Sequence, residues 1–409
     1  MKIGKLREIG PATMVTAAFI GPGTVITASL AGANFGYALL WALLFSVCAS
    51  MVLQEMAARL GIVTQRGLGE NIRESFQHPF ARWSATALVV SAIFIGNAAY
   101  QGGNIAGASV GVTAFSGDLF ATESTTLNVP AVLITAIAFG LLWKGNYRVI
   151  EQALVALVAL MSLAFLATFA VTRPNLGELI QGLLIPGIPD GAALTVIALI
   201  GTTVVPYNLF LHSASVSEKW HDAKQLPEAR RDLFFSIPLG GLISIAILAT
   251  AASAFFRHQI QLEDAGELAG ALSPLFGSAA SILLGIGLFA AGISSALTAP
   301  LAAAFALRGV LGLQRGMNAT GFRLAWLAVL LCGGLIATLG VRPVEVIWFA
   351  QVANGLLLPI VTGFLLWEMN TPRLGAHRNS HWQNLLGCVV LLVTVLLGGR
   401  SLLSAFGML

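Results

Sequence analysis

Ile20-Gly21-Pro22-Gly23-Thr24 interrupts the first long apolar segment of the chain, which runs from about residue 12 to residue 32. Two glycines and a proline within this stretch are poor helix formers. A second interruption, Val205-Pro206-Tyr207-Asn208, lies inside another apolar segment in the second half of the chain. Irregular backbone at membrane depth is tolerated only where it is buried in protein or lines a cavity. Two interrupted membrane helices in corresponding positions therefore indicate a binding site between them.

The composition is that of an integral membrane protein. Of the 409 residues, 57% are hydrophobic and 10% are charged, whereas a soluble domain carries about 25% charged residues. A helix that spans a bilayer needs ~20 mainly apolar residues. Eleven segments fit this description: 12–32, 37–62, 84–108, 128–143, 150–172, 192–214, 233–256, 277–307, 321–341, 344–368 and 382–405.

Basic residues predict the orientation of these segments. If the amino terminus is cytoplasmic, 18 of the 22 lysines and arginines fall on the cytoplasmic side, and the other four are Arg173, Arg257, Arg342 and Arg400. The positive-inside rule then supports eleven spans, with the carboxyl terminus outside. The first segment is expected to stay as a membrane helix and not to be a cleaved signal peptide, because many spans follow it.

These features predict an all-α, multi-pass protein of the inner or plasma membrane of a bacterial-type cell. Breaks in the first and sixth of eleven helices suggest five plus five helices in inverted repeat and one additional helix, the plan of many secondary transporters. The whole chain, 1–409, forms one transmembrane domain in this interpretation. Its repeats cover about 12–172 and 192–368, and the additional helix covers about 382–405.

The predicted substrate site is built from neutral residues at the two breaks. Backbone at the glycines could approach a ligand closely, because no side chain stands in the way, and hydroxyl and amide groups could form hydrogen bonds. The predicted binding residues here are Gly21, Gly23, Thr24, Thr202, Val205, Tyr207 and Asn208.

The third segment carries a polar stripe. Asn97, Tyr100, Gln101 and Asn104 follow the i, i+3, i+4, i+7 spacing that places residues on one helical face. One such residue alone would be read as an interhelical hydrogen bond, but four on one face predict a cavity lining. Gln351, in the tenth segment, is a further candidate.

Electrostatics at the breaks favours a negative group on the substrate. New half-helices are expected to begin at about Val25 and Asn208, and their N-termini present partial positive charge. Divalent cations prefer carboxylate oxygens, and transition metals also use Cys, His or Met. Neither break offers such a residue, so no metal ligand is predicted there.

Two titratable residues are candidates for coupling or gating. His212 lies one turn after Asn208 and could move protons, or it could be a hydrogen-bonded packing residue. Glu55 is the carboxylate well inside a predicted span, and it precedes Arg59 by four residues. It could form a plain interfacial ion pair or act as a coupling group, because intramembrane acids are often functional.

Other classes of function find no support in the sequence. There is no nucleophile with its base, no phosphate-binding loop and no His-rich cluster, so neither an enzyme nor a cofactor is predicted. Cys48, Cys332 and Cys388 all lie in apolar runs and form no CxxC pattern. The basic residues are scattered over short loops, which does not indicate nucleic-acid binding.

Several stretches resemble the natural resistance-associated macrophage proteins, the Nramp family of proton-coupled divalent metal transporters. They are Ala31-Gly32-Ala33-Asn34-Phe35-Gly36-Tyr37, Ala58-Arg59-Leu60-Gly61-Ile62-Val63-Thr64, Asn208-Leu209-Phe210-Leu211-His212-Ser213, Ala290-Ala291-Gly292-Ile293-Ser294-Ser295 and Gln351-Val352. The resemblance covers most of the chain and implies the LeuT-type fold, with helices 1 and 6 unwound at mid-membrane and with alternating access.

The chain departs from that family at the metal site. Gly21 and Thr24 stand where the family has a metal-binding Asp and Asn, and Val205 and Tyr207 replace a Met and a His. We therefore expect the substrate to be a small polar, anionic or zwitterionic solute. H⁺ or Na⁺ is the candidate coupling ion for its transport. The alternatives are a divalent cation, Mn²⁺ or Mg²⁺, in a rebuilt neutral site and a passive channel.

Overall fold

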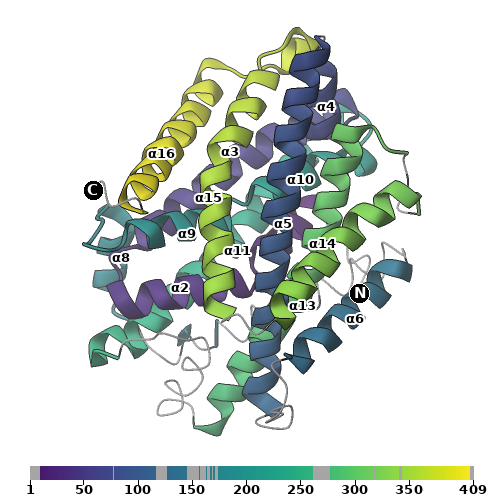
Figure 1. Cartoon of the computed structure of the whole chain (residues 1–409). Coiled ribbons are helices and arrows are strands. Elements are labelled where there is room, and N and C mark those ends of the chain that lie inside the picture. Colours follow the sequence, from purple (N-terminus) through teal and green to yellow (C-terminus); the bar gives the residue numbers. More distant parts are fainter. Residues whose placement is uncertain are drawn as a thin grey trace, which may run out of the picture.

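The computed structural model describes residues 10–76, 78–116, 127–144, 174–260, 277–314, 318–339 and 343–405, with a few isolated positions between them. Helices dominate the described chain, which contains no strand (Figure 1). The α-helices are α1 Pro11–Phe19, α2 Pro22–Phe35, α3 Leu40–Thr64, α4 Leu68–Ser75, α5 Pro79–Ser116, α6 Val129–Lys144, α8 Leu176–Leu184, α9 Ala193–Thr203, α10 Pro206–Lys219, α11 Leu226–Ala254, α13 Ser278–Leu311, α14 Thr320–Thr338, α15 Pro343–Glu368 and α16 His381–Ala405. Short 3-10 turns are η2 Ala223–Gln225, η3 Phe256–His258 and η4 Pro372–His377.

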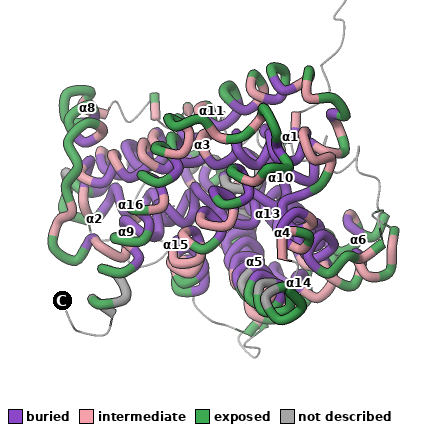
Figure 2. The backbone as a smooth tube through the Cα atoms, turned by 90° about the horizontal axis from the view of Figure 1, so that it is seen from above, coloured by how far each residue is buried: buried purple, intermediate pink, exposed green. Residues whose placement is uncertain are grey.

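Ten of the eleven predicted membrane segments coincide with these helices, and the fifth, 150–172, lies almost entirely outside the described residues. Eight stretches of the described chain are long and apolar enough to cross a membrane, and α6 is a shorter apolar helix. The interior of the bundle is buried and its periphery exposed (Figure 2). Exposed apolar side chains on the outer helix α16, such as Leu392 and Leu396, are suited to lipid contact. The boundaries of the two repeats remain a prediction.

Both predicted interruptions are present, and they have the same local design. α1 ends at Phe19 and α2 begins at Pro22, while α9 ends at Thr203 and α10 begins at Pro206. In each case an extended residue, Gly21 or Val205, is the N-cap and a proline follows at the first helical position. Proline is favoured there, because its fixed φ suits the helix and its missing N–H would be unpaired anyway.

The half-helices begin earlier than the sequence predicted. We expected α2 and α10 to start at about Val25 and Asn208, but they start at Pro22 and Pro206. The physical reason is that proline interrupts a helix in its interior but is favoured at N1, where it starts one. The irregular backbone is therefore confined to Ile20–Gly21 and to Val204–Val205.

Small residues allow α5 to lie against its neighbours in the centre of the bundle. A Cβ atom added to Gly292 of α13 would lie 2.3 Å from the Cβ of Ala108, and one added to Gly107 would lie 2.2 Å from the Cβ of Pro22. Close approach through small residues is the usual packing mode of membrane helices. It places the polar stripe of α5 beside the start of α2.

Candidate functional site

The two breaks are joined by a direct contact between side chains. Thr24 Oγ1 lies 2.8 Å from Thr202 Oγ1, so the first turn of α2 is hydrogen-bonded to the last turn of α9. Both residues are fully buried. Two residues that are 178 positions apart in the chain thus form the centre of the candidate site.

α15 covers the breaks from one side. A Cβ added to Gly23 would lie 2.2 Å from Gln351 Nε2, and one added to Gly201 would lie 2.0 Å from the Gln351 carbonyl oxygen. Glycine at both positions therefore lets Gln351 lie directly on the α2 and α9 backbones. Val205 is buried as well and supplies the N-cap of α10 through its backbone.

The polar stripe of α5 borders the breaks at Tyr100 and Asn104, while Gln101 contacts α13. The Tyr100 and Tyr207 rings are 5.4 Å apart in an edge-to-face arrangement. Gln101 Nε2 donates to the carbonyl oxygen of Ala296 in α13, at 3.1 Å. A Cβ added to Gly21 would lie 3.3 Å from Asn104 Oδ1, so Asn104 borders the first break.

Asn97, the fourth member of the stripe, is held by its own helix. Its Nδ2 donates to the Ile93 carbonyl oxygen at 2.8 Å, and the residue is 1% exposed. Among the described residues, no hydrogen-bond partner is found for its Oδ1. A contact between Asn97 and the substrate stays a prediction.

Buried amide groups at the site have hydrogen-bonding capacity left over. Within the described chain, no partner is found for either side-chain polar atom of Asn208, for Gln351 Oε1, for Gln101 Oε1 or for Asn104 Nδ2. All four residues are at most 1% exposed. Unsatisfied buried polar atoms are costly, so their concentration at the breaks indicates a place for a polar ligand or for water.

Four helix ends meet at the site, two of each polarity. The N-termini of α2 and α10 present partial positive charge, and the C-termini of α1 and α9 present carbonyl oxygens with partial negative charge. The N-termini alone predict a negative group on the ligand. The observed ends are balanced, and carbonyl ends of this kind bind cations in other transporters.

His212 is fully buried in α10, and its Nδ1 lies 2.8 Å from Gln54 Oε1 of α3. No partner is found for Nε2 among the described residues. The contact gives the ring a fixed orientation, as in a packing histidine, and leaves one nitrogen for a further bond. A role in coupling stays a prediction.

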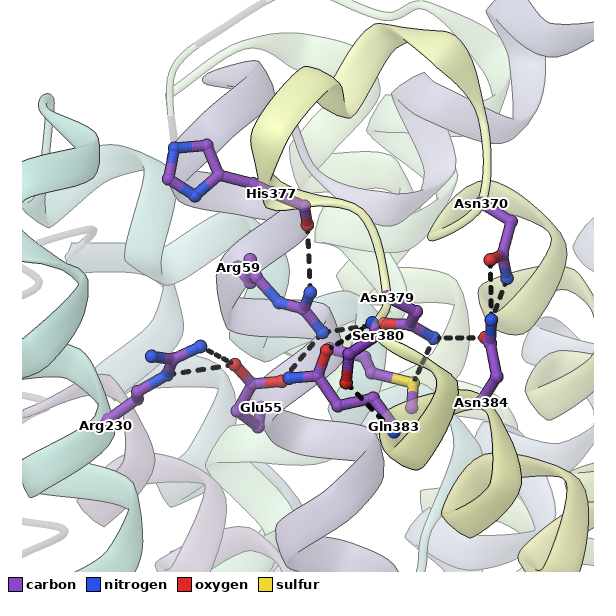
Figure 3. A network of polar contacts seen from close by, with 10 residues as sticks. Glu55, Arg59, Arg230, Asn370, His377, Asn379, Ser380, Gln383 and Asn384 are labelled. Atoms are coloured by element: carbon purple, nitrogen blue, oxygen red, sulfur yellow. Dashed lines mark hydrogen bonds and ion pairs between the residues drawn. The ribbon is translucent and has the colours of Figure 1, made fainter.

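Glu55 forms the ion pair with Arg59 that its spacing predicts, at 3.0 Å, and also contacts a second arginine. Arg230 of α11 donates to Glu55 Oε1 from Nη2 at 2.7 Å and from Nε at 3.0 Å. Arg59 also donates to the His377 carbonyl oxygen and to Asn379 Oδ1 (Figure 3). Glu55 and Arg59 together therefore connect α3 with α11 and with the α15–α16 connection.

The structure also adds residues that the sequence did not single out. A Cβ added to Gly21 would lie 2.5 Å from Ser295 Oγ of α13, which makes Ser295 a neighbour of the first break. Asp232 of α11 accepts a hydrogen bond from the Ala12 backbone N–H at 2.9 Å and so caps α1. Neither contact has a local sequence signal, because each joins residues more than 200 positions apart.

The described residues contain no cluster of three or more His, Cys, Asp or Glu side chains that could hold a metal ion. The site therefore has no charged ligand of its own. It consists of hydroxyl, amide and backbone groups, brought together by α2, α5, α9, α10, α13 and α15.

Comparison with known proteins identifies the family. Residues 12–404 match the family model described as natural resistance-associated macrophage protein-like. The chain belongs to the Nramp family. Members of this family are membrane transporters and not enzymes, in agreement with the expectation from the sequence.

Curated relatives extend over the full length of this Nramp protein. It is 28% identical to the divalent metal cation transporter MntH of Klebsiella pneumoniae, over 97% of this chain and 93% of the relative. It is also 28% identical to the protein of the same name from Yersinia pestis, over 98% of this chain and 95% of the relative.

Solved structures confirm the LeuT-type fold. The manganese transporter of Eremococcus coleocola superposes with a TM-score of 0.78 at 23% identity, covering 97% of this chain and 86% of that one. MhsT in complex with L-phenylalanine gives a TM-score of 0.66 at 17% identity, covering 96% and 99%. MHP1, a nucleobase-cation-symport-1 family transporter, gives 0.59 at 14% identity, covering 98% and 94%.

Proposed function

We propose that this Nramp protein is a secondary transporter that carries a divalent cation by alternating access. In this proposal the ion keeps part of its hydration shell and is bound by neutral oxygens at the two helix breaks. The full-length relatives named divalent metal cation transporters support the substrate class. Our expectation of a non-metal solute gains no support from these names.

The observation that carries the proposal is the set of buried oxygens at the breaks. Asn208 Oδ1 and Gln351 Oε1 have no partner among the described residues, and α1 and α9 each end in backbone carbonyls at a break. Amide and backbone carbonyl oxygens are ordinary ligands of hard divalent cations. Mg²⁺ and similar ions keep several waters in protein sites, so a shell without carboxylates suits an ion that is not fully dehydrated.

A small polar, anionic or zwitterionic solute remains the second candidate, and a specific observation favours it. Asn208 Nδ2 and Asn104 Nδ2 are buried donors without partners in the described chain, and the N-termini of α2 and α10 add partial positive charge. These groups would bind a carboxylate more readily than a metal ion. A coupling ion, H⁺ or Na⁺, is proposed for either substrate.

Direct binding to purified protein separates the two candidates. Titration calorimetry with Mn²⁺ and with Mg²⁺ is expected to give saturable binding. Thr24→Ala removes the hydroxyl that joins the breaks. It is expected to weaken cation binding about tenfold, the effect of losing one oxygen that contacts the ion or accepts a hydrogen bond from its hydration water. Thr24→Ser keeps the hydroxyl and serves as the matched control. The same ions should enter proteoliposomes with saturable kinetics.

Two outcomes would overturn the cation proposal. If neither ion binds saturably while a solute from a metabolite panel stabilises the protein in a Thr24-dependent way, the substrate is a small solute. If ions instead cross planar bilayers with an ohmic current, the protein is a channel and not a carrier.

A further inference from the structure

A basic cavity opens on the face of the protein that is predicted to be cytoplasmic. Its volume is about 380 Å³, and it lies between η2, the start of α11 and the α15–α16 connection. Four basic side chains line it, together with one histidine and one glutamine: Arg59, Lys224, Arg230, Arg378, His377 and Gln383.

Positive charge exceeds negative charge at this cavity. None of its lining residues is acidic. Glu55 contacts Arg59 and Arg230 and balances one of the four cations. Asp222 is the nearby acid that caps η2, and it accepts a hydrogen bond from the Lys224 backbone N–H. Lysines and arginines on this side are expected from orientation alone, but scattered surface charges do not by themselves line a cavity.

Arg59 provides independent evidence for a ligand. Its side chain is 3% exposed and is held by the Glu55 carboxylate, the His377 carbonyl oxygen and Asn379 Oδ1 (Figure 3). Its Nε has no hydrogen-bond partner among the described residues. A buried guanidinium with an unused N–H, in the wall of a basic cavity, is suited to an anion with several acceptor oxygens.

The position of the cavity suits the polar surface of a membrane. Trp382, which precedes the lining residue Gln383, is 75% exposed at the start of α16. Exposed tryptophans are enriched at the level of lipid headgroups. Basic pockets between membrane helices on the cytoplasmic side are known to bind anionic headgroups.

We propose that this cavity binds a phosphate-type anion, carried either by a lipid headgroup or by a soluble phosphate. Lys224 and Arg378 would contact the anion from the exposed rim, and Arg59 and Arg230 would contact it from the base. Such a ligand would connect α3, α11 and the α15–α16 connection, the same three elements that Glu55 and Arg59 together connect.

The test uses the full-length protein in detergent. Thermal stability is titrated with sodium phosphate against sodium gluconate at constant ionic strength, and retained lipid is measured by native mass spectrometry with phosphatidylglycerol and with phosphatidylcholine. The double variant Lys224→Gln/Arg378→Gln loses two rim cations and is expected to raise the half-saturating phosphate concentration, or to reduce phosphatidylglycerol retention, about tenfold or more.

Arg231→Gln is the matched control, because Arg231 is an exposed neighbour of Arg230 that does not line the cavity. Arg231→Gln should change the half-saturating phosphate concentration and the phosphatidylglycerol retention less than about twofold, because a single exposed surface charge contributes little. An effect of phosphate alone assigns a soluble ligand, and an effect of phosphatidylglycerol alone assigns a lipid. The proposal is overturned if phosphate stabilises the protein no more than gluconate does and phosphatidylglycerol is retained no better than phosphatidylcholine. It is also overturned if Arg231→Gln weakens binding as much as the double variant does.

Discussion

Gly21 shows how a single residue limits what the first break can hold. Its φ of −105° and ψ of −177° describe ordinary extended backbone, so a larger residue would not strain the chain there. The space beside it is the constraint, because an added Cβ would lie 2.5 Å from Ser295 Oγ. The residue that faces Gly21 from α13 therefore decides whether an acid can be accommodated.

Gly21→Asp is predicted to raise the affinity for divalent cations when Ser295 is also replaced by a smaller residue. An aspartate here would cap α2 and place a negative charge at the break, which should tighten Mn²⁺ binding by about tenfold or more. Calorimetry on Gly21→Asp/Ser295→Gly, with Gly21→Asp and Ser295→Gly alone as controls, checks this. Affinity that stays at the parent level in a folded double variant would show that Gly21 is not at the cation site.

Individual site residues could be predicted where the pattern is local. The stripe of Tyr100, Gln101 and Asn104 follows from helical spacing. The structure places Tyr100 beside Tyr207 and Asn104 beside Gly21, while Gln101 contacts α13. Their contact with a substrate stays a prediction. Ser295 and Asp232 could not be predicted, because their contacts depend on how helices distant in sequence pack. The charge balance at the breaks differs from the prediction, because the carbonyl ends of α1 and α9 oppose the N-termini of α2 and α10.

At the scale of helices, hydropathy located the elements well. The predicted span 382–405 matches α16, His381–Ala405, and 344–368 matches α15, Pro343–Glu368. Errors are larger elsewhere: 84–108 is shorter than α5, Pro79–Ser116, at both ends, and 233–256 misses the first turns of α11, Leu226–Ala254. At the breaks the half-helices start two or three residues early, at Pro22 and Pro206. Apolar length is a strong signal over ~20 residues, whereas the start of a helix depends on the single residue at its first position.

Glu55 pairs with Arg230 of α11 and holds Arg59, which reaches the α15–α16 connection, so its removal is predicted to destabilise the protein. Glu55→Gln would leave the buried Arg59 without its carboxylate, at a cost of about 3 kcal/mol. Thermal unfolding in detergent should show a clearly lower midpoint. Arg66→Gln is the control, since Arg66 pairs with Glu74 on the exposed surface, where such pairs contribute about 0–1 kcal/mol. Equal midpoints for both variants would contradict a structural role for Glu55.

At the scale of the whole molecule, the distribution of lysines and arginines predicts the orientation. Fusion of alkaline phosphatase after Leu409 should give an active enzyme, because the predicted carboxyl terminus is outside. Fusion of alkaline phosphatase after Asn370, in the α15–α16 connection, should give an inactive enzyme. Fusion of green fluorescent protein at the same residue should give a fluorescent product. The reverse pattern would invert the predicted orientation and place the basic cavity on the outer face.

Both breaks have the same junction, an extended residue followed by a proline. The residues that set the backbone of the site are therefore different from those that supply its polar groups. Pro22 and Pro206 set where α2 and α10 begin, while Thr24, Thr202 and Gln351 supply the polar groups around them. The junction backbone and the ligand-facing side chains are thus carried by different residues. Substitutions at Thr24, Thr202 and Gln351 are therefore expected to alter which cargo is bound more than where the half-helices begin.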